Sequence, residues 1–158
     1  MIRLKTKWPY AICNRNVLTT YYIGNGKGRE VEIVETIQRI IDDNEPHKAY
    51  IGVTHHPCGR FTGYYWPEKP LPLGAQMQYN YDKDEYLAED AHGLFYKTMF
   101  LVCYLHDLEA LNALEIQTIA EIRKTRVGRL NNSDDGGGYA TKSDVYFLYI
   151  CISNMLES

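Results

Sequence analysis

Apolar side chains recur with a helical period in two parts of the chain. Over residues 30–43 they keep the i, i+3 and i+4 spacing of a helix with one buried face. Residues 108–124 repeat leucine and isoleucine near the same spacing, and Asp107 in front of them is a suitable N-cap. The polar segment DDNEPH, which contains Pro46, ends the first helix. The sequence therefore predicts two amphipathic helices.

Other stretches are rich in β-branched and aromatic residues, as strands are. They are TTYYIG (19–24), KAYIGVT (48–54), TMFLVCYL (98–105) and VYFLYICI (145–152). The third run is almost continuously apolar, which favours a central strand that is covered on both faces. Strands and helices mix along one chain of 158 residues, so we expect a single domain of the α/β or α+β class.

The stretch between the second and third predicted strands is less regular. HHPCGRFTGYY is predicted to be a loop that enters a short helix carrying Arg60 and Tyr64. Prolines in PEKPLPLG (67–74) indicate a surface loop, and a further helix is expected around 84–97. We interpret residues 64–97 as a tyrosine-rich variable insert within the single domain.

Composition and charge narrow the classes of function. The net charge is −3, so nucleic-acid binding would need a local basic patch. The 14 tyrosines suit binding surfaces and wet clefts, because each joins an apolar ring to a hydroxyl. The four cysteines are widely spaced, which favours a reducing compartment over a disulfide framework. No apolar leader and no run long enough to span a bilayer is visible, so we expect a cytoplasmic protein without membrane contacts.

The tripeptide YIG occurs twice, at 22–24 and at 50–52. As strings the two copies are identical, and each is an ordinary way to end a strand. The second copy is followed by further candidate site residues, beginning with Arg60, eight residues after Gly52. The spacing therefore favours the second copy as the one that carries chemistry.

Three later features complete the pattern. Glu115, in ALEIQTI, is flanked by apolar residues, so its carboxylate is expected to be partly buried and to need a cation, hydrogen bonds or a metal. The segments LNN and GGG then follow the helix. The YIG strand, Arg60, the ALE helix and LNN…GGG, in this order, resemble the GIY-YIG nuclease superfamily over roughly residues 48–138.

The resemblance implies a small, mostly antiparallel sheet of three to four strands flanked by helices, and it implies roles for the matched residues. Tyr50 would lie at the scissile phosphate, as general base or as its relay. Arg60 would contact the phosphate and offset the negative charge of the transition state. Glu115 would hold a single divalent cation, Mg²⁺ or Mn²⁺, because such an ion prefers oxygen ligands and keeps several waters.

Supporting roles follow from the same resemblance. Tyr64, one helical turn after Arg60, matches a position that the family often fills with histidine or tyrosine. Asn132, or else Asn131, would brace the active-site loop, with Gly52 in support at the end of the strand. Apart from the resemblance, His55 or His56, close to Tyr50 in sequence, is a candidate to assist proton transfer, since histidine titrates near neutrality.

The family's GIY strand pairs with its YIG strand, and no GIY triplet lies shortly before the second YIG. Three strands are candidates for its place. The one we favour is TTYYIG, with the first predicted helix inserted in the hairpin and Tyr21 or Tyr22 as the GIY tyrosine. In a second arrangement PYAI pairs with TTYYIG, so that Tyr10, Tyr22 and Arg29 form the site. In a third, VYFLYI lies beside KAYIGVT by a permuted connection.

Two further motifs suggest other chemistry. His55, His56 and Cys58 would suit zinc, but structural zinc needs four ligands in paired spacing, and the other cysteines and histidines are scattered. GNGKGR (24–29) matches neither common phosphate-binding glycine motif. We interpret it as a basic loop in which Lys27 and Arg29 contact the phosphate backbone of a substrate.

These observations predict a metal-dependent endonuclease that hydrolyses phosphodiester bonds in DNA. The substrate would be double-stranded or branched DNA. Because tyrosines can stack on unpaired bases, the tyrosine-rich insert also suits a branched or single-stranded substrate. A homodimer that cuts both strands is one arrangement. The alternative is a GIY-YIG-like module without activity that binds nucleic acid or a protein partner. The acidic balance favours this alternative, whereas the retained Arg60 and Glu115 argue against it.

Overall fold

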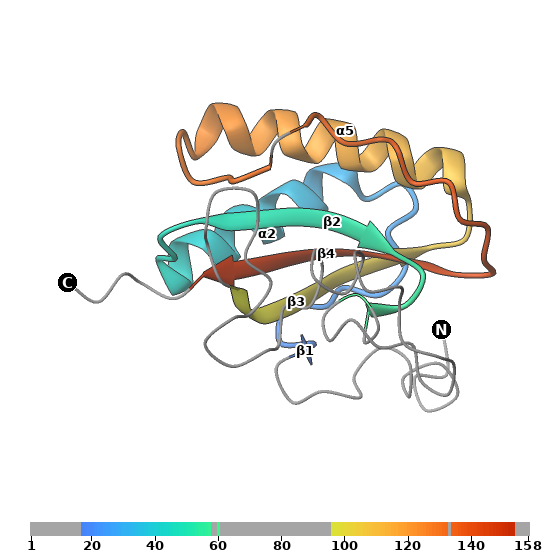
Figure 1. The fold of residues 1–158 in the computed structure, drawn as a ribbon, viewed down its shortest axis with the longest axis horizontal. Helices are drawn as coiled ribbons and strands as arrows, with labels where there is room; N and C mark the ends of the chain where they lie inside the picture. The colour runs from blue at the N-terminus through green and yellow to red at the C-terminus, as the bar shows by residue number, and fades with distance from the viewer. Residues whose placement is uncertain (1–16, 58–59, 61–95, 133, 154–158) are drawn as a thin grey trace, which may run out of the picture.

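Four strands form a mixed sheet in the computed structural model, which describes residues 17–57, 60, 96–132 and 134–153 (Figure 1). The elements are β1 (Val17–Leu18), α2 (Glu30–Asn44), β2 (Ala49–Thr54), β3 (Tyr96–Leu105), α5 (Leu108–Thr125) and β4 (Tyr146–Ser153). The order across the sheet is β1-β3-β4-β2. β4 pairs antiparallel with both β2 and β3, and β1 pairs parallel with β3. The predicted α+β class, with a mostly antiparallel sheet flanked by helices, is confirmed.

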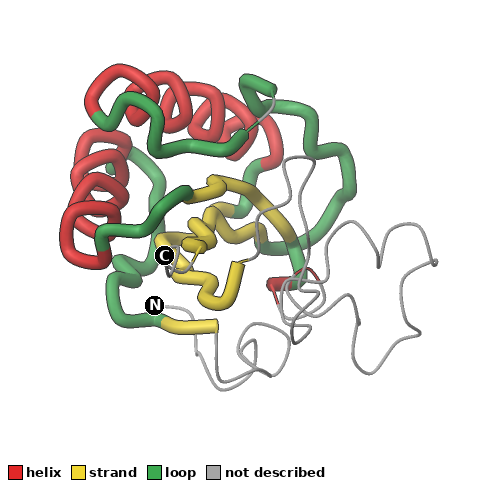
Figure 2. The backbone as a smooth tube through the Cα atoms, turned by 60° about the vertical axis from the view of Figure 1, so that its left-hand side comes forward, coloured by secondary structure: helices red, strands yellow, loops and turns green. Residues whose placement is uncertain are grey.

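Both helices lie on the same side of the sheet (Figures 1 and 2). The buried side of α2 consists of Ile33, Val34, Thr36, Ile37, Ile40 and Ile41, as the helical period predicts. The side chain of Asp107 accepts a hydrogen bond from the N–H of Ala110 at 3.3 Å, so Asp107 is the predicted N-cap of α5. These apolar faces pack with every second residue of β2 and β4 into one core.

A second apolar cluster uses the alternate residues of the same strands. In β4 it contains Phe147, Tyr149 and Cys151, whereas Leu148 and Ile150 belong to the helix-covered core. The partly buried Tyr50 of β2 packs against this second cluster. Successive side chains of a strand point to opposite faces, so Tyr50 and Tyr149 lie on the face away from the helices.

The prediction of a strand at 19–24 is wrong. The chain turns there, with the N–H of Tyr22 donating to the carbonyl of Thr19 at 3.1 Å. The next residues run along the edge of β3, where the N–H of Ile23 donates to Val102 at 2.9 Å and the N–H of Tyr104 donates to Gly24 at 2.9 Å. The backbone groups of this segment therefore bond to β3. The segment lies at the edge of the sheet opposite β2.

The favoured pairing of TTYYIG with KAYIGVT is therefore also wrong, and the structure has the permuted pairing of the third arrangement. PYAI and Tyr10, which the second arrangement needs, lie outside the described residues. β4 lies beside β2, with Tyr50 opposite Cys151 and Gly52 opposite Tyr149. The first helix connects the two edges of the sheet instead of interrupting a hairpin.

Several predictions fall outside the described residues. They are Tyr64, Cys58, the proline-rich loop, most of the insert 64–97 and most of the helix expected around 84–97. Residues 96 and 97, at the end of that predicted helix, belong to β3, which begins two residues before the predicted strand. Within the described part of the chain, no helix is long and apolar enough to cross a membrane.

Candidate functional site

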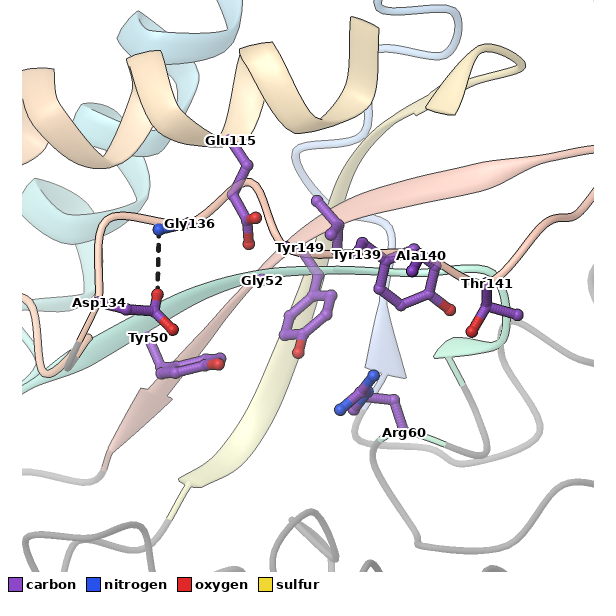
Figure 3. Close-up of a pocket in the computed structure, with 12 residues that line it drawn as sticks. Tyr50, Gly52, Arg60, Glu115, Asp134, Gly136, Tyr139, Ala140, Thr141 and Tyr149 are labelled. Carbon is purple, nitrogen blue, oxygen red and sulfur yellow. Dashed lines mark hydrogen bonds between the residues drawn. The ribbon is translucent and has the colours of Figure 1, made fainter. Parts of the chain in front are cut away.

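A cavity of about 370 Å³ lies along the edge strand β2, and residues of α5, of the loop that follows it and of β4 contribute to its lining (Figure 3). Its lining comes from five parts of the chain: Tyr50, Gly52 and Val53 of β2; Arg60; Glu115 of α5; Asp134, Gly136, Gly138, Tyr139, Ala140 and Thr141 of the loop after α5; and Tyr149 of β4. Figure 3 shows the carboxylate of Glu115 and the guanidinium of Arg60 pointing into it from opposite sides. The structure thus brings Tyr50, Arg60 and Glu115 together on one concave surface.

Glu115 is a buried carboxylate of α5, with 8% of its surface exposed. Its Oε1 accepts a hydrogen bond from the N–H of Gly137 at 2.7 Å. Burial raises the pKa of Glu115, and the negative charge of Asp134 adds to this effect. The Gly137 N–H and the Arg60 guanidinium lower that pKa without offsetting the burial. The site therefore disfavours the ionised carboxylate unless more positive charge enters.

The GGG segment is explained by its close approach to α5. Gly136 has a φ of +85°, and a Cβ there would lie 2.9 Å from Cγ of Glu115. Gly137 has a φ of +87°, and a Cβ there would lie 2.5 Å from Cδ1 of Ile116. Both the conformation and the space call for glycine. These two glycines let the loop backbone reach the Glu115 carboxylate.

Asn132 fastens the start of this loop to β2. Its Nδ2 donates to the carbonyl of Ile51 at 2.7 Å, and its Oδ1 accepts from the N–H of Ile51 at 3.0 Å. The neighbouring Asn131 contacts β2 through its main chain, whose N–H donates to Ala49 at 2.8 Å. The side chain in the predicted bracing position is therefore that of Asn132.

Two side chains of α5 hold the rest of the loop. Arg123 donates to the carbonyls of Asn132 and Asp134 at 3.0 and 2.7 Å and to the carboxylate of Asp135 at 2.6 Å. Asn112 donates to the carbonyl of Tyr139 at 2.9 Å and accepts from its N–H at 3.1 Å. The segment over Glu115 is thus fixed at both ends, which positions the cavity wall before any ligand binds.

Tyr149 was not among the predicted site residues, yet its side chain lines the cavity beside Tyr50. The two ring centroids are 6.5 Å apart. A Cβ on Gly52 would lie 2.3 Å from the Tyr149 hydroxyl, so this glycine makes room for the phenol. The signal that could have found Tyr149 is the alternation of β4, taken together with the permuted pairing.

Arg60 reaches the cavity from a helical turn that follows β2. Its N–H donates to the carbonyl of His56 at 2.9 Å. Its positive charge opposes the effect of burial on the pKa of Glu115 and of Cys151. Arg60 is thus a cation that faces the acidic side of the cavity, which suits an anionic group placed between them.

Other predicted site residues do not line the cavity. Tyr22 lies toward the β1 edge of the sheet, and burial raises its pKa. His56 is buried, with 4% exposed, and it is His55 that contacts the lining, through an Nδ1 to Tyr139 hydroxyl distance of 2.5 Å. Arg29 pairs with Glu32 at 2.5 Å and donates to the carbonyl of Ile23 at 2.8 Å.

The loop that carries Lys27 and Arg29 runs along β3. The N–H of Gly26 donates to the carbonyl of Tyr104 at 2.8 Å, and β4 separates β3 from the β2 edge. The structure therefore does not bring Lys27 and Arg29 to the cavity.

The carboxylates of the cavity fit a hard divalent cation. Glu115 and Asp134 line the same space, and the Asp134 charge acts on Glu115. Among the described residues there is no cluster of three or more histidine, cysteine, aspartate or glutamate side chains that could hold a metal. A cation here would rely on one or two carboxylates and on waters, a donor set that suits Mg²⁺.

Comparisons of the chain with protein-family models, with curated proteins and with solved structures gave no match. The case for a function therefore depends on the order of motifs in the sequence and on the geometry of this cavity.

Proposed function

We propose that this protein is a metal-dependent endonuclease that hydrolyses phosphodiester bonds in DNA, in the manner of the GIY-YIG nucleases it resembles. The observation that carries the proposal is that Tyr50, Arg60 and Glu115 line one cavity although they come from three separate segments. A tyrosine, a buried carboxylate and an arginine in one concave site are groups that phosphoryl-transfer chemistry needs.

Arg60 binds the scissile phosphate in this proposal. Its planar guanidinium matches two phosphate oxygens, and it offsets the charge that develops on them. Tyr50 acts as a relay: it receives a proton from the attacking water while it passes its own phenolic proton to solvent water, so that its charge does not change. The water oxygen bonds to phosphorus as the bond from phosphorus to the leaving oxygen breaks, and the leaving oxygen takes a proton back from solvent. A phenol with a pKa near 10 is a weak base by itself, and a relay avoids this difficulty.

Tyr149 takes the place that the resemblance gives to the tyrosine of the GIY strand. β4 is the antiparallel neighbour of β2, and Tyr149 stands opposite Gly52 of the YIG tripeptide. Its phenol lies beside that of Tyr50. In this proposal Tyr149 replaces Tyr22 in the site.

Glu115, assisted by Asp134, would hold the divalent cation. When bound, the cation would offset the negative charge on the leaving oxygen. The raised pKa of Glu115 supports this role, because a nearby cation stabilises the ionised carboxylate that burial disfavours.

A DNA-nicking assay tests the proposal. Supercoiled plasmid is incubated with the protein and Mg²⁺ or Mn²⁺, and relaxed and linear products are measured. We expect the wild type to cut, and Glu115→Gln and Arg60→Ala to lose at least about a hundredfold in rate. The matched control is Glu121→Gln, an α5 glutamate that pairs with Lys124 at 3.2 Å. A Glu115→Gln variant that cuts like the wild type refutes the assignment of the site.

The second candidate is a related module without activity that binds nucleic acid or a protein partner. The net charge of −3 favours it, as does the pairing of Arg29, Arg123 and Arg126 with acidic side chains. A wild type that retards DNA in a gel without cutting it supports this candidate. A protein that neither cuts nor retards DNA points to a protein partner.

A further inference from the structure

The outer edge of β2 has a regular alternation of backbone groups. β2 lies at one edge of the sheet, so every second residue turns its N–H and C=O away from β4. Ala49 is such a residue, because its N–H donates to Arg129 and its C=O accepts from Asn131, both at 2.8 Å. Ile51 is the next, through its two bonds to the side chain of Asn132. By the same alternation, Val53 and His55 also face outward.

The outward groups on either side of Val53 have partners. The N–H of His55 donates to the hydroxyl of Tyr139 at 3.0 Å. On the other side, Asn132 occupies both groups of Ile51. Between them, no group among the residues that the structure describes accepts the N–H of Val53 on this edge.

The residue that carries this N–H, Val53, is 6% exposed and lines the cavity together with Arg60. A buried backbone N–H without a protein partner is rare in folded proteins, and the exceptions call for water or a ligand. The position therefore indicates a hydrogen-bond acceptor inside the cavity.

The space beside Val53 suits a compact acceptor. The neighbouring outward residues, Ile51 and His55, lie about 7 Å away along the strand on either side. The N–H groups of both are already bonded, to Asn132 and to Tyr139. An added β-strand needs several consecutive outward groups, so it cannot pair here. A phosphate oxygen needs only one donor from this edge, and Arg60 supplies others from another direction.

We propose that the Val53 N–H donates a hydrogen bond to a non-bridging oxygen of the scissile phosphate, and so positions it against the Arg60 guanidinium. The inference rests on the proposed function and names a contact of the same site. No charge moves and no bond breaks in this contact, which makes Val53 a positioning residue. The contact would favour the reaction because the N–H of a strand is already held in position before the substrate binds.

NMR titration with a single phosphodiester tests the contact directly. The probe is the dinucleoside phosphate of thymidine, added to the full-length protein with EDTA, with thymidine itself as the control that lacks the phosphate. We expect the Val53 amide proton to move downfield with the dinucleotide and to stay in place with thymidine. The amide of Ile51, already bonded to Asn132, serves as the internal reference.

A pair of variants adds a kinetic readout. Val53→Pro removes the N–H, and proline is tolerated where an edge strand turns its N–H outward. Val53→Ala also shortens the side chain but keeps the N–H. We expect Val53→Pro to lose about tenfold or more in kcat/KM for DNA relative to Val53→Ala, the usual effect of one lost hydrogen bond to a charged group. If Val53→Pro does not fold, the wild-type titration alone decides.

The two proposals fail in different ways. Movement of the Arg60 side-chain signals without the Val53 amide overturns the contact and leaves the nuclease proposal standing. Equal kcat/KM for the two folded variants also overturns the contact. If no cavity signal responds and the wild type does not cut DNA, the proposed function and the contact fall together.

Discussion

Gly52 and Tyr149 face each other across β2 and β4, and the phenol of Tyr149 occupies the space that a side chain at position 52 would fill. A Cβ on Gly52 would lie 2.3 Å from the Tyr149 hydroxyl and 2.5 Å from Cζ. Tyr149 is only 1% exposed, so its ring cannot move away at low cost. The absence of a side chain at Gly52 therefore provides the space that the Tyr149 ring of the neighbouring strand occupies.

Gly52→Ala should destabilise the protein by about 1–3 kcal/mol, because it overpacks a rigid contact. The free energy of unfolding, measured in urea, checks this value. Gly138→Ala is the matched control, since that glycine also lines the cavity but a Cβ there has no atom within 4 Å. Equal stability of both variants and the wild type would show that Tyr149 moves freely.

Tyr149→Phe should reduce the rate of DNA cleavage by about a hundredfold, as Tyr50→Phe should, because each removes a hydroxyl from the proposed site and keeps the ring. Tyr22→Phe should leave the rate within a factor of about two, since it lies toward the other edge of the sheet. Single-turnover kinetics on one plasmid substrate compare the three. The reverse order, with Tyr22→Phe inactive and Tyr149→Phe active, would contradict the assignment of Tyr149 and return the role of the second tyrosine to Tyr22.

Glu115→Gln should be as stable as the wild type at pH 7, or more stable by about 1.4 kcal/mol for each unit by which the folded pKa of Glu115 exceeds its unfolded pKa. Burial raises the pKa of Glu115 in the folded state. Its contribution to stability is therefore fully present below the unfolded pKa, about 4.3, and is lost as the pH rises through the folded pKa. Glutamine stays neutral and can still accept from the Gly137 N–H.

Urea unfolding with EDTA at pH 4 and pH 7 measures this difference. The advantage of Glu115→Gln should appear at pH 7 and vanish near pH 4, where both side chains are neutral. A glutamine variant that is clearly less stable at pH 7 than at pH 4, relative to the wild type, would contradict the direction of the pKa change.

Mg²⁺ or Mn²⁺ should raise the melting temperature of the wild type. At ten times the Kd, a cation that binds only the folded state stabilises it by about 1.4 kcal/mol. Glu115→Gln should abolish the shift, and Asp134→Asn should reduce it, since the two carboxylates line the same cavity. An unchanged shift in Glu115→Gln would place the cation elsewhere.

The sequence was sufficient for the elements whose pattern is local. The isoleucines of α2 and the N-cap Asp107 of α5 have the predicted positions, because helix periodicity and capping are set within a few residues. The grouping of Tyr50, Arg60 and Glu115 in one cavity could also be predicted, through the order of the motifs.

Strand pairing could not be predicted in the same way. TTYYIG has the composition of a strand, but its backbone turns between Thr19 and Tyr22 and has a positive φ at Gly24. With these turns the segment lies along β3 and bonds to it. Which edge a segment joins depends on hydrogen bonds between distant residues, and no local pattern encodes them. Tyr149 was missed for the same reason, since its place beside Tyr50 follows from the β2–β4 pairing alone.

The position of β4 between β2 and β3 has a consequence for biosynthesis. β4 follows the other described strands in the sequence, yet both of its neighbours bond to it. On a ribosome the nascent chain therefore holds β2 and β3 without their shared partner until Tyr146–Ser153 has emerged. The Tyr149 phenol reaches Gly52 only after this strand has emerged, so Tyr149 joins the cavity wall later than the lining residues of β2 and α5. A chain that ends before β4 would lack both the pairing partner of β2 and the Tyr149 phenol.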